Sequence, residues 1–138
     1  MKKVYIQTFG CQMNARDSEV VKGLLLAEGY ALTENKKEAD VVLLNTCSVR
    51  QHAEDRVWSI LGEFKNFDKR ILRAKSSQLK ANKPIVGLLG CMAQNYKKEA
   101  FRKASGLDIV CGPSEIDNIA LYIEEALRDR DKVLAVAE

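Results

Sequence analysis

The sequence has little of what the common small metal and redox sites are built from. Its only histidine is His52, and its four cysteines form no C-x-x-C pair. Zinc ribbons and thioredoxin-type redox sites depend on such pairs, so neither class fits. We interpret His52 as a surface residue of a helical stretch, which leaves sulfur as the expected ligand of any metal site.

Long apolar runs and targeting signals are also missing. No run approaches the roughly 18 apolar residues that a membrane-spanning helix needs, and Met1-Lys2-Lys3 passes directly into a strand pattern without a signal core or cleavage site. We therefore expect a cytoplasmic protein with no membrane partner. Because cytosolic thiols stay reduced, metal or redox chemistry explains the four cysteines better than a disulfide framework does.

The composition is that of an ordinary globular domain, and its positive charge is concentrated in one segment. Hydrophobic residues make up 46% of the 138 residues and charged residues 30%, with a net charge of +3. Residues 65–83 contain seven Lys or Arg and a single acid, Asp68. Two interpretations of this segment stay open: a solvated helix face with a loop, or a contact with RNA phosphates.

Strand patterns alternate with helical patterns along the chain. The expected strands are 4–9, 30–33, 41–44, 85–89 and 107–110, and residues 133–136 have the pattern of one more. Residues 41–44 are apolar at every position, as in a strand that is covered on both faces. This alternation predicts an α/β domain with a parallel sheet of about five strands, in the flavodoxin-like order 2-1-3-4-5 of a three-layer sandwich.

Local signals predict several helix ends. Asn14 is expected to cap the first helix and Gly29 to follow its last turn. Residues 92–104 are expected to form one helix, and Ser114 with Asp117 to cap the last one.

Cys11, Cys47 and Cys91 each follow a predicted strand, at the point where the chain turns toward a helix. Parallel strands would bring all three thiols to one carboxyl edge of the sheet, which is where open α/β sheets hold ligands. Thiolates are soft ligands that suit zinc, copper(I) or iron–sulfur clusters, and of these we favour iron. Three thiolates on a four-iron cluster would leave one iron open for chemistry.

The residues around the three thiols leave further alternatives. Cys111 also ends a strand, so it is either a fourth ligand or part of the packing, and we favour packing. The polar neighbours either cap helices and form turns or tune a cluster through hydrogen bonds to sulfur; they are Gln12, Asn14, Asn45, Thr46 and Ser48.

Three motifs make the chain resemble a known family. They are Gly10-Cys11-Gln12-Met13-Asn14 with Asp17-Ser18-Glu19, Asn45-Thr46-Cys47-Ser48-Val49-Arg50, and Gly90-Cys91-Met92-Ala93-Gln94. Together they resemble the N-terminal domain of the radical-SAM methylthiotransferases, a class of transferases. The first two motifs are similar to the tRNA-modifying branch, which methylthiolates N6-isopentenyladenosine next to the anticodon. The branch that acts on a ribosomal protein typically has Pro-Lys after the first cysteine, which is not the pattern here.

The resemblance implies a cofactor and a domain organisation. Cys11, Cys47 and Cys91 would hold an auxiliary 4Fe–4S cluster that carries the sulfur to be transferred, and no role follows for Cys111. Residues 1–128 would form this domain and residues 129–138 would begin a linker. A radical-SAM domain with a second 4Fe–4S cluster and S-adenosylmethionine, and a C-terminal domain that helps to bind tRNA, would complete a monomeric enzyme. Because these residues contain no C-x-x-x-C-x-x-C motif, we do not expect the isolated domain to turn over.

The sequence leaves three rival functions open. The predicted sheet would also suit a flavodoxin-like module for a nucleotide, flavin or cobalamin, although no G-x-G-x-x-G motif or P-loop follows the first strand. A zinc-stabilised interaction domain and a methylthiotransferase that modifies a ribosomal protein are the other two.

Overall fold

The computed structural model describes residues 2–9, 12–35, 38–46, 51–64, 84–104, 106–129 and 132–136. The basic segment 65–83 lies outside these residues. The described strands are β1 (Lys3–Thr8), β2 (Ala31–Leu32), β3 (Val41–Thr46), β4 (Ile85–Gly90), β5 (Ile109–Cys111) and β6 (Val133–Ala135). The described helices are α1 (Gln12–Ala27), α2 (Gln51–Gly62), α4 (Cys91–Tyr96), α5 (Glu99–Lys103), the 3-10 helix η1 (Pro113–Asn118) and α6 (Ile119–Asp129).

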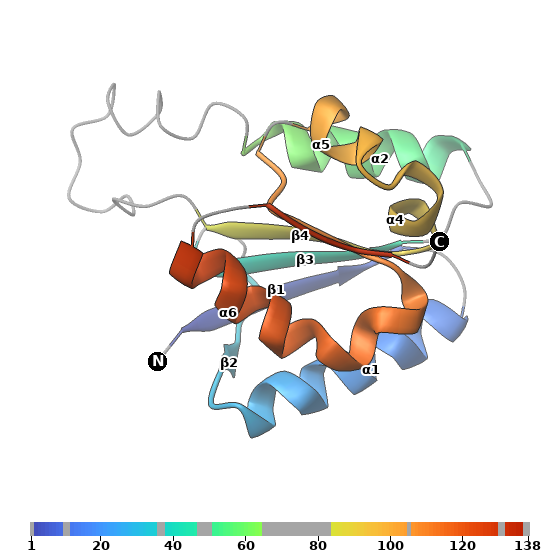
Figure 1. The fold of residues 1–138 in the computed structure, drawn as a ribbon. Coiled ribbons are helices and arrows are strands. Elements are labelled where there is room, and N and C mark those ends of the chain that lie inside the picture. Colours follow the sequence, from blue (N-terminus) through green and yellow to red (C-terminus); the bar gives the residue numbers. More distant parts are fainter. Residues whose placement is uncertain are drawn as a thin grey trace.

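The strands form one parallel sheet in the order β2-β1-β3-β4-β5-β6 (Figure 1). This confirms the α/β class and the predicted order of the first five strands. Residues 133–135 add β6 beside β5 at the edge of the sheet, so the strand expected near the end of the chain is also confirmed. The sheet therefore has six strands rather than about five.

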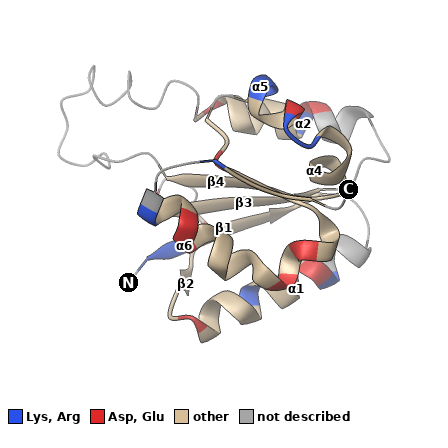
Figure 2. Ribbon diagram, in the orientation of Figure 1, with Lys and Arg blue, Asp and Glu red and all other residues tan. Residues whose placement is uncertain are grey.

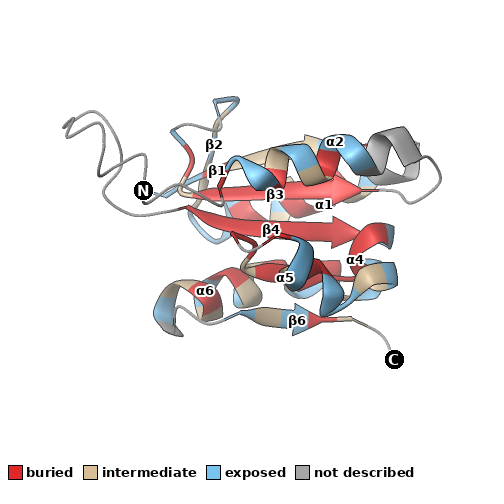
Figure 3. Ribbon diagram, turned by 90° about the horizontal axis from the view of Figure 1, so that it is seen from above, coloured by how far each residue is buried: buried red, intermediate tan, exposed pale blue. Residues whose placement is uncertain are grey.

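Helices cover both faces of the sheet, with α2, α4 and α5 on one side and α1 and α6 on the other (Figure 1). Strands β3 and β4 are buried at every position (Figure 3). Their side chains alternate between two apolar clusters: Val42 and Leu44 pack with residues of α2 and α4, whereas Val41 and Leu43 pack with residues of α1 and α6. An uninterrupted apolar strand thus supplies both cores of a three-layer sandwich.

The close packing of the sheet explains the glycine in β4. A Cβ atom on Gly87 would lie 2.7 Å from Leu43 Cδ2 and 3.6 Å from the Cβ of Ile109. Gly87 therefore lets the side chains of the two neighbouring strands close over β4, as its place in a strand pattern predicts.

The connection from β2 to β3 is short because β2 is short. Leu32, the last residue of β2, and Val41, the first of β3, both pair with Val4, one on each side of β1. The chain therefore only has to pass the amino end of β1. Most parallel connections need a dozen or more residues because the chain has to run back along the whole sheet, and this connection does not.

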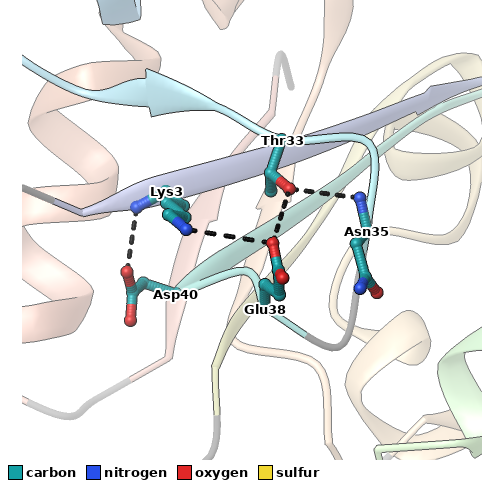
Figure 4. A network of polar contacts seen from close by, with 5 residues as sticks. All are labelled: Lys3, Thr33, Asn35, Glu38 and Asp40. Carbon is teal, nitrogen blue, oxygen red and sulfur yellow. Dashed lines mark hydrogen bonds and ion pairs between the residues drawn. The ribbon is translucent and has the colours of Figure 1, made fainter.

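Hydrogen bonds fasten this connection to the start of β1 (Figure 4). The backbone N–H of Lys3 donates to Asp40 Oδ2 at 2.8 Å, and the Lys3 ammonium lies 3.8 Å from Glu38 Oε2. The Thr33 hydroxyl accepts a hydrogen bond from the backbone N–H of Asn35 at 3.1 Å. The two Lys3 contacts hold the connection against β1, and the Thr33 contact lies within the connection.

The C-terminal end of α1 agrees with the prediction from the sequence, but its N-terminal start does not. Gly29 has φ +93°, which confirms that it follows the last turn of the helix, and the N–H groups of Gly29 and Tyr30 donate to the carbonyls of Leu26 and Leu25 in a Schellman pattern. The helix already begins at Gln12. The prediction that Asn14 caps α1 is therefore wrong, because Asn14 lies inside the first helical turn.

Two further helix predictions are wrong. Residues 92–104 form two short helices, since Lys97 has φ 51° and ψ −132° and closes α4 by donating its N–H to the Ala93 carbonyl. Ser114 lies inside η1, whose N-cap residue is Gly112 and has no side-chain cap. Pro113 starts this 3-10 helix because its fixed φ suits a first helical position.

The packing around Gly87 leads to a stability prediction. We expect Gly87→Ala to lower the free energy of unfolding by about 1–3 kcal/mol, because the new methyl group overpacks the Leu43 side chain. Gly23→Ala in α1 is the matched control. A Cβ there meets nothing within 4 Å, so alanine should stabilise the helix by about 0.5–1 kcal/mol. Urea unfolding measures both, and equal effects would contradict the packing argument.

Candidate functional site

Three neighbouring strands end together at the carboxyl edge of the sheet. Thr8 of β1 pairs with Asn45 of β3, and Thr46 of β3 pairs with Gly90 of β4. Cys11, Cys47 and Cys91 follow these strand ends by three, one and one residues. The chain segments that carry the three cysteines therefore leave the sheet from adjacent strands and in register. Cys11 and Cys47 themselves lie outside the described residues.

Cys91 is the cysteine of this set that the structure describes. It is the first residue of α4 and is exposed. The next two residues, Met92 and Ala93, are fully buried in the cluster under α2 and α4. The helix is thus anchored by its apolar residues, and the thiol remains on the surface at the sheet edge.

The backbone before Cys91 requires glycine. Gly90 has φ 93° and ψ −153°, a conformation that is essentially restricted to glycine. A Cβ there would overlap the backbone oxygen of Thr46 and lie 3.0 Å from Asn45 Oδ1. The Gly-Cys sequence therefore lets β4 approach β3 closely, one residue before the candidate ligand.

A partly buried chain of hydrogen bonds joins the elements beneath this edge. Ser18 of α1, which is 2% exposed, lies 2.6 Å from the Thr8 hydroxyl at the end of β1. The same Ser18 hydroxyl accepts a hydrogen bond of 3.0 Å from Asn45 Nδ2 at the end of β3. The backbone N–H of Phe9 donates to the Asn45 carbonyl at 2.8 Å. Ser18 and Asn45 thus link the segments on both sides of Cys11 to the strand that precedes Cys47.

Thr46 extends this network to β4, because its hydroxyl donates to the Leu89 carbonyl at 2.6 Å. Asn45 and Thr46 are fully buried strand residues. The expectation that they cap helices or form turns is therefore wrong, and tuning of a cluster by them stays a prediction.

The sequence motifs include Ser18, but sequence reasoning assigned it no role. The signal that could have indicated its role is its place, in the first turns of a helix that follows a strand-end cysteine.

Cys111 lies in a different environment. It is fully buried at the end of β5, in the apolar cluster that includes Ile119 and Ile123 of α6. Its thiol donates weakly to the Gly112 carbonyl at 3.6 Å. Burial, together with the charge of Glu115, raises the pKa of the thiol from 9.0 to about 12. The prediction that Cys111 belongs to the packing is confirmed.

Among the described residues, no three His, Cys, Asp or Glu side chains form a group that could hold a metal ion. Cys11 and Cys47 are not among these residues. No helix in the described ranges is long and apolar enough to cross a membrane. His52 lies in α2.

The backbone of Gly90 leads to a prediction with an internal control. Gly29 has the same φ of +93°, but a Cβ on it meets nothing within 4 Å. We expect Gly29→Ala to cost about 1–2 kcal/mol from backbone strain alone, and Gly90→Ala to cost about 1–3 kcal/mol more because of the overlap with Thr46. Urea unfolding measures both variants, and similar costs would show that the contact with β3 is unimportant.

The raised pKa of Cys111 leads to a pH prediction. Below pH 9 the thiol is protonated in both the folded and the unfolded chain, so its stabilising effect is fully present. Between pH 9 and about 12 only the unfolded chain ionises, and this stability is lost. The cost of Cys111→Ala should therefore be about 1 kcal/mol smaller at pH 10 than at pH 8. Urea unfolding of both proteins at the two pH values tests this, and a constant cost would contradict it.

Comparison with known proteins identifies the family. The model of the family described as "Uncharacterized protein family UPF0004" matches residues 3–112, which include all three cysteines of the candidate site and also Cys111. The match therefore covers β1 to β5 and the edge at which they end.

Curated relatives carry names that state an activity. The chain is 43% identical over 136 residues to a tRNA-2-methylthio-N(6)-dimethylallyladenosine synthase of a Sulfurihydrogenibium species, covering 99% of the chain and 29% of that protein. It is 46% identical over 112 residues to the synthase of the same name from Porphyromonas gingivalis, covering 81% and 22%. It is 39% identical over 138 residues to the mitochondrial tRNA methylthiotransferase of Homo sapiens, covering 99% and 20%. The chain thus spans less than a third of the length of these relatives, and by the match to residues 3–112 it belongs to the UPF0004 family.

Proposed function

We propose that this chain is the N-terminal domain of a tRNA methylthiotransferase. In this role it holds an auxiliary 4Fe–4S cluster and supplies the sulfur for methylthiolation of N6-isopentenyladenosine, also called N6-dimethylallyladenosine, next to the anticodon. The names of the relatives support the tRNA substrate. Because the chain spans less than a third of their length, the radical-SAM and C-terminal domains of the longer polypeptide, with S-adenosylmethionine and a second cluster, belong to the same proposal.

The observation that carries the proposal is the common end of β1, β3 and β4. Their adjacent, in-register carboxyl ends start the three segments that contain Cys11, Cys47 and Cys91. Without this register, ligands separated by tens of residues would have no reason to converge. The exposed thiol of Cys91 at this edge suits a cofactor that must also be reached by a substrate.

The donor set fits an iron–sulfur cluster. Cys11, Cys47 and Cys91 would be its ligands, and all are thiolate donors of the kind that such clusters use. When bound, the cluster would supply the sulfur that is transferred. The chain's own part is to keep the three segments in place, through the Ser18–Asn45 hydrogen bonds and the close contact of Gly90 with Thr46.

The ligand set is tested by iron and sulfide content. The wild-type protein and single Cys→Ala variants at positions 11, 47 and 91 are purified without oxygen, and iron and acid-labile sulfide are quantified. We expect about four irons in the wild type and loss of stable loading in each of these variants. Cys111→Ala is the matched control, since its buried thiol lies in the packing, and its iron content should be unchanged.

Several outcomes would contradict this proposal. Equal loss from all four variants would show that the effect is general destabilisation, and unchanged iron in the first three would remove the ligand set. Stoichiometric zinc would favour the zinc-stabilised domain, and flavin absorption the nucleotide-type module. Mass spectrometry of tRNA nucleosides and of ribosomal protein, after reaction with the longer enzyme, decides between the two methylthiotransferase substrates.

A further inference from the structure

The two helical layers of the domain differ in charge. In α1, η1 and α6 there are seven acidic residues and three basic ones. In α2 and residues 91–103 there are three acidic residues and five basic ones. Figure 2 shows acidic residues along α1 and α6, and basic residues on α5. A polyanion would therefore approach the domain more favourably from the side of α2, α4 and α5.

Several cations on this side have no carboxylate partner in the described part of the chain. The lysine face, as we name it, consists of Arg56, Lys97, Lys98 and Lys103 together with the rings of Trp58 and Tyr96. All four cations are exposed, and no ion pair joins any of them to a described carboxylate. By contrast, Lys22 on the acidic layer lies 3.5 Å from Glu19. Binding of phosphate at the lysine face would break no existing ion pair.

Aromatic rings hold two of these cations in place. The rings of Trp58 and Tyr96 meet edge to face with centroids 5.1 Å apart, and Lys103 Nζ lies 5.6 Å from the centroid of each ring. The guanidinium of Arg56 lies 5.6 Å from the ring of Phe9. Such contacts order the side chains without neutralising their charge.

The lysine face adjoins the candidate site. Tyr96 ends the helix that Cys91 begins, and five residues of helix rise only about 8 Å. Arg56 stacks on Phe9, which lies two residues before Cys11 in the sequence. The face therefore extends from the carboxyl edge of the sheet over α2 and α5.

We propose that the lysine face binds the sugar–phosphate backbone of the tRNA whose base is modified at the sheet edge. This inference rests on the proposed function and adds the surface of this domain that positions the RNA. Lysines without carboxylate partners would neutralise phosphates, and the partly exposed Trp58 and Tyr96 would offer ring surface to the sugar or an unstacked base. Charge favours RNA over an apolar protein partner at this face.

The test uses charge removal in the longer enzyme. A variant with Lys97→Gln, Lys98→Gln and Lys103→Gln is compared with a control that removes the same charge from the acidic layer, Arg16→Gln, Lys22→Gln and Arg128→Gln. Arg56 is left intact because its contact with Phe9 lies close to the Cys11 segment. Affinity for tRNA that carries N6-dimethylallyladenosine is measured from 50 to 300 mM salt, with iron content and thermal unfolding recorded for each protein.

We expect the lysine-face variant to bind tRNA about tenfold or more weakly at 0.1 M salt, and its salt slope to fall by about 2–3, whereas the control stays within about twofold of wild type. Iron content should not change. Equal binding by the two variants, or loss without a change in salt slope, would overturn the proposal. The latter result would point to packing of the face on another domain.

Photo-crosslinking supplies a readout that needs no variant. With the wild-type enzyme and tRNA, the peptides that contain Trp58 and Tyr96 should crosslink to RNA, and peptides from α1 and α6 should not. Crosslinks confined to α1 and α6 would overturn the lysine face. If the wild-type enzyme methylthiolates tRNA but neither test gives the expected result, the lysine-face proposal is wrong and the proposed function stands. If the enzyme neither binds nor modifies tRNA, the proposed function itself is wrong.

Discussion

The candidate site depends on the register of three adjacent parallel strands. Thr8 pairs with Asn45, and Thr46 pairs with Gly90, so β1, β3 and β4 end together at the carboxyl edge of the sheet. A shift of one residue in a buried strand would exchange the side chains of its two faces. In β3 it would move Leu43 and Leu44 between the two apolar clusters. The same packing that stabilises the sheet therefore fixes where the three cysteine segments begin.

Polar contacts refine what the apolar packing sets. Ser18 and Asn45 are buried and hydrogen-bonded to one another, and Ser18 is also hydrogen-bonded to Thr8. Because the Ser18–Asn45 bond lies out of water, it is electrostatically stronger than the same bond at the surface. These residues join α1, β1 and β3, so a helix that follows Cys11 is connected to the strand that precedes Cys47. Rigid support of this kind is what a ligand site at a sheet edge requires.

The sequence predicted the strands and their order well, because the apolar runs of this sheet are distinct and the crossover rules leave few alternatives. The Schellman end at Gly29 was also predictable, since glycine after an apolar helical pattern has one common use. The break at Lys97 was not, because a non-glycine residue with φ 51° has no sequence signature. For Asn45 and Thr46 the residue types left caps, turns and cluster tuning open, and only the tertiary neighbours Ser18 and the Leu89 carbonyl show why polar residues complete a buried strand.

The contrast between Cys91 and Cys111 shows how the fold separates a candidate ligand from a packing residue. Both follow or end neighbouring strands, and Leu89, two residues before Cys91, pairs with Cys111. Metal binding requires the thiolate, and burial beside Ile119 and Ile123 raises the pKa of Cys111 to about 12. Cys91, beyond the end of its strand, is exposed and avoids that desolvation. Whether the cysteine lies within the strand or just beyond its end therefore decides whether it is buried, as Cys111 is, or exposed, as Cys91 is.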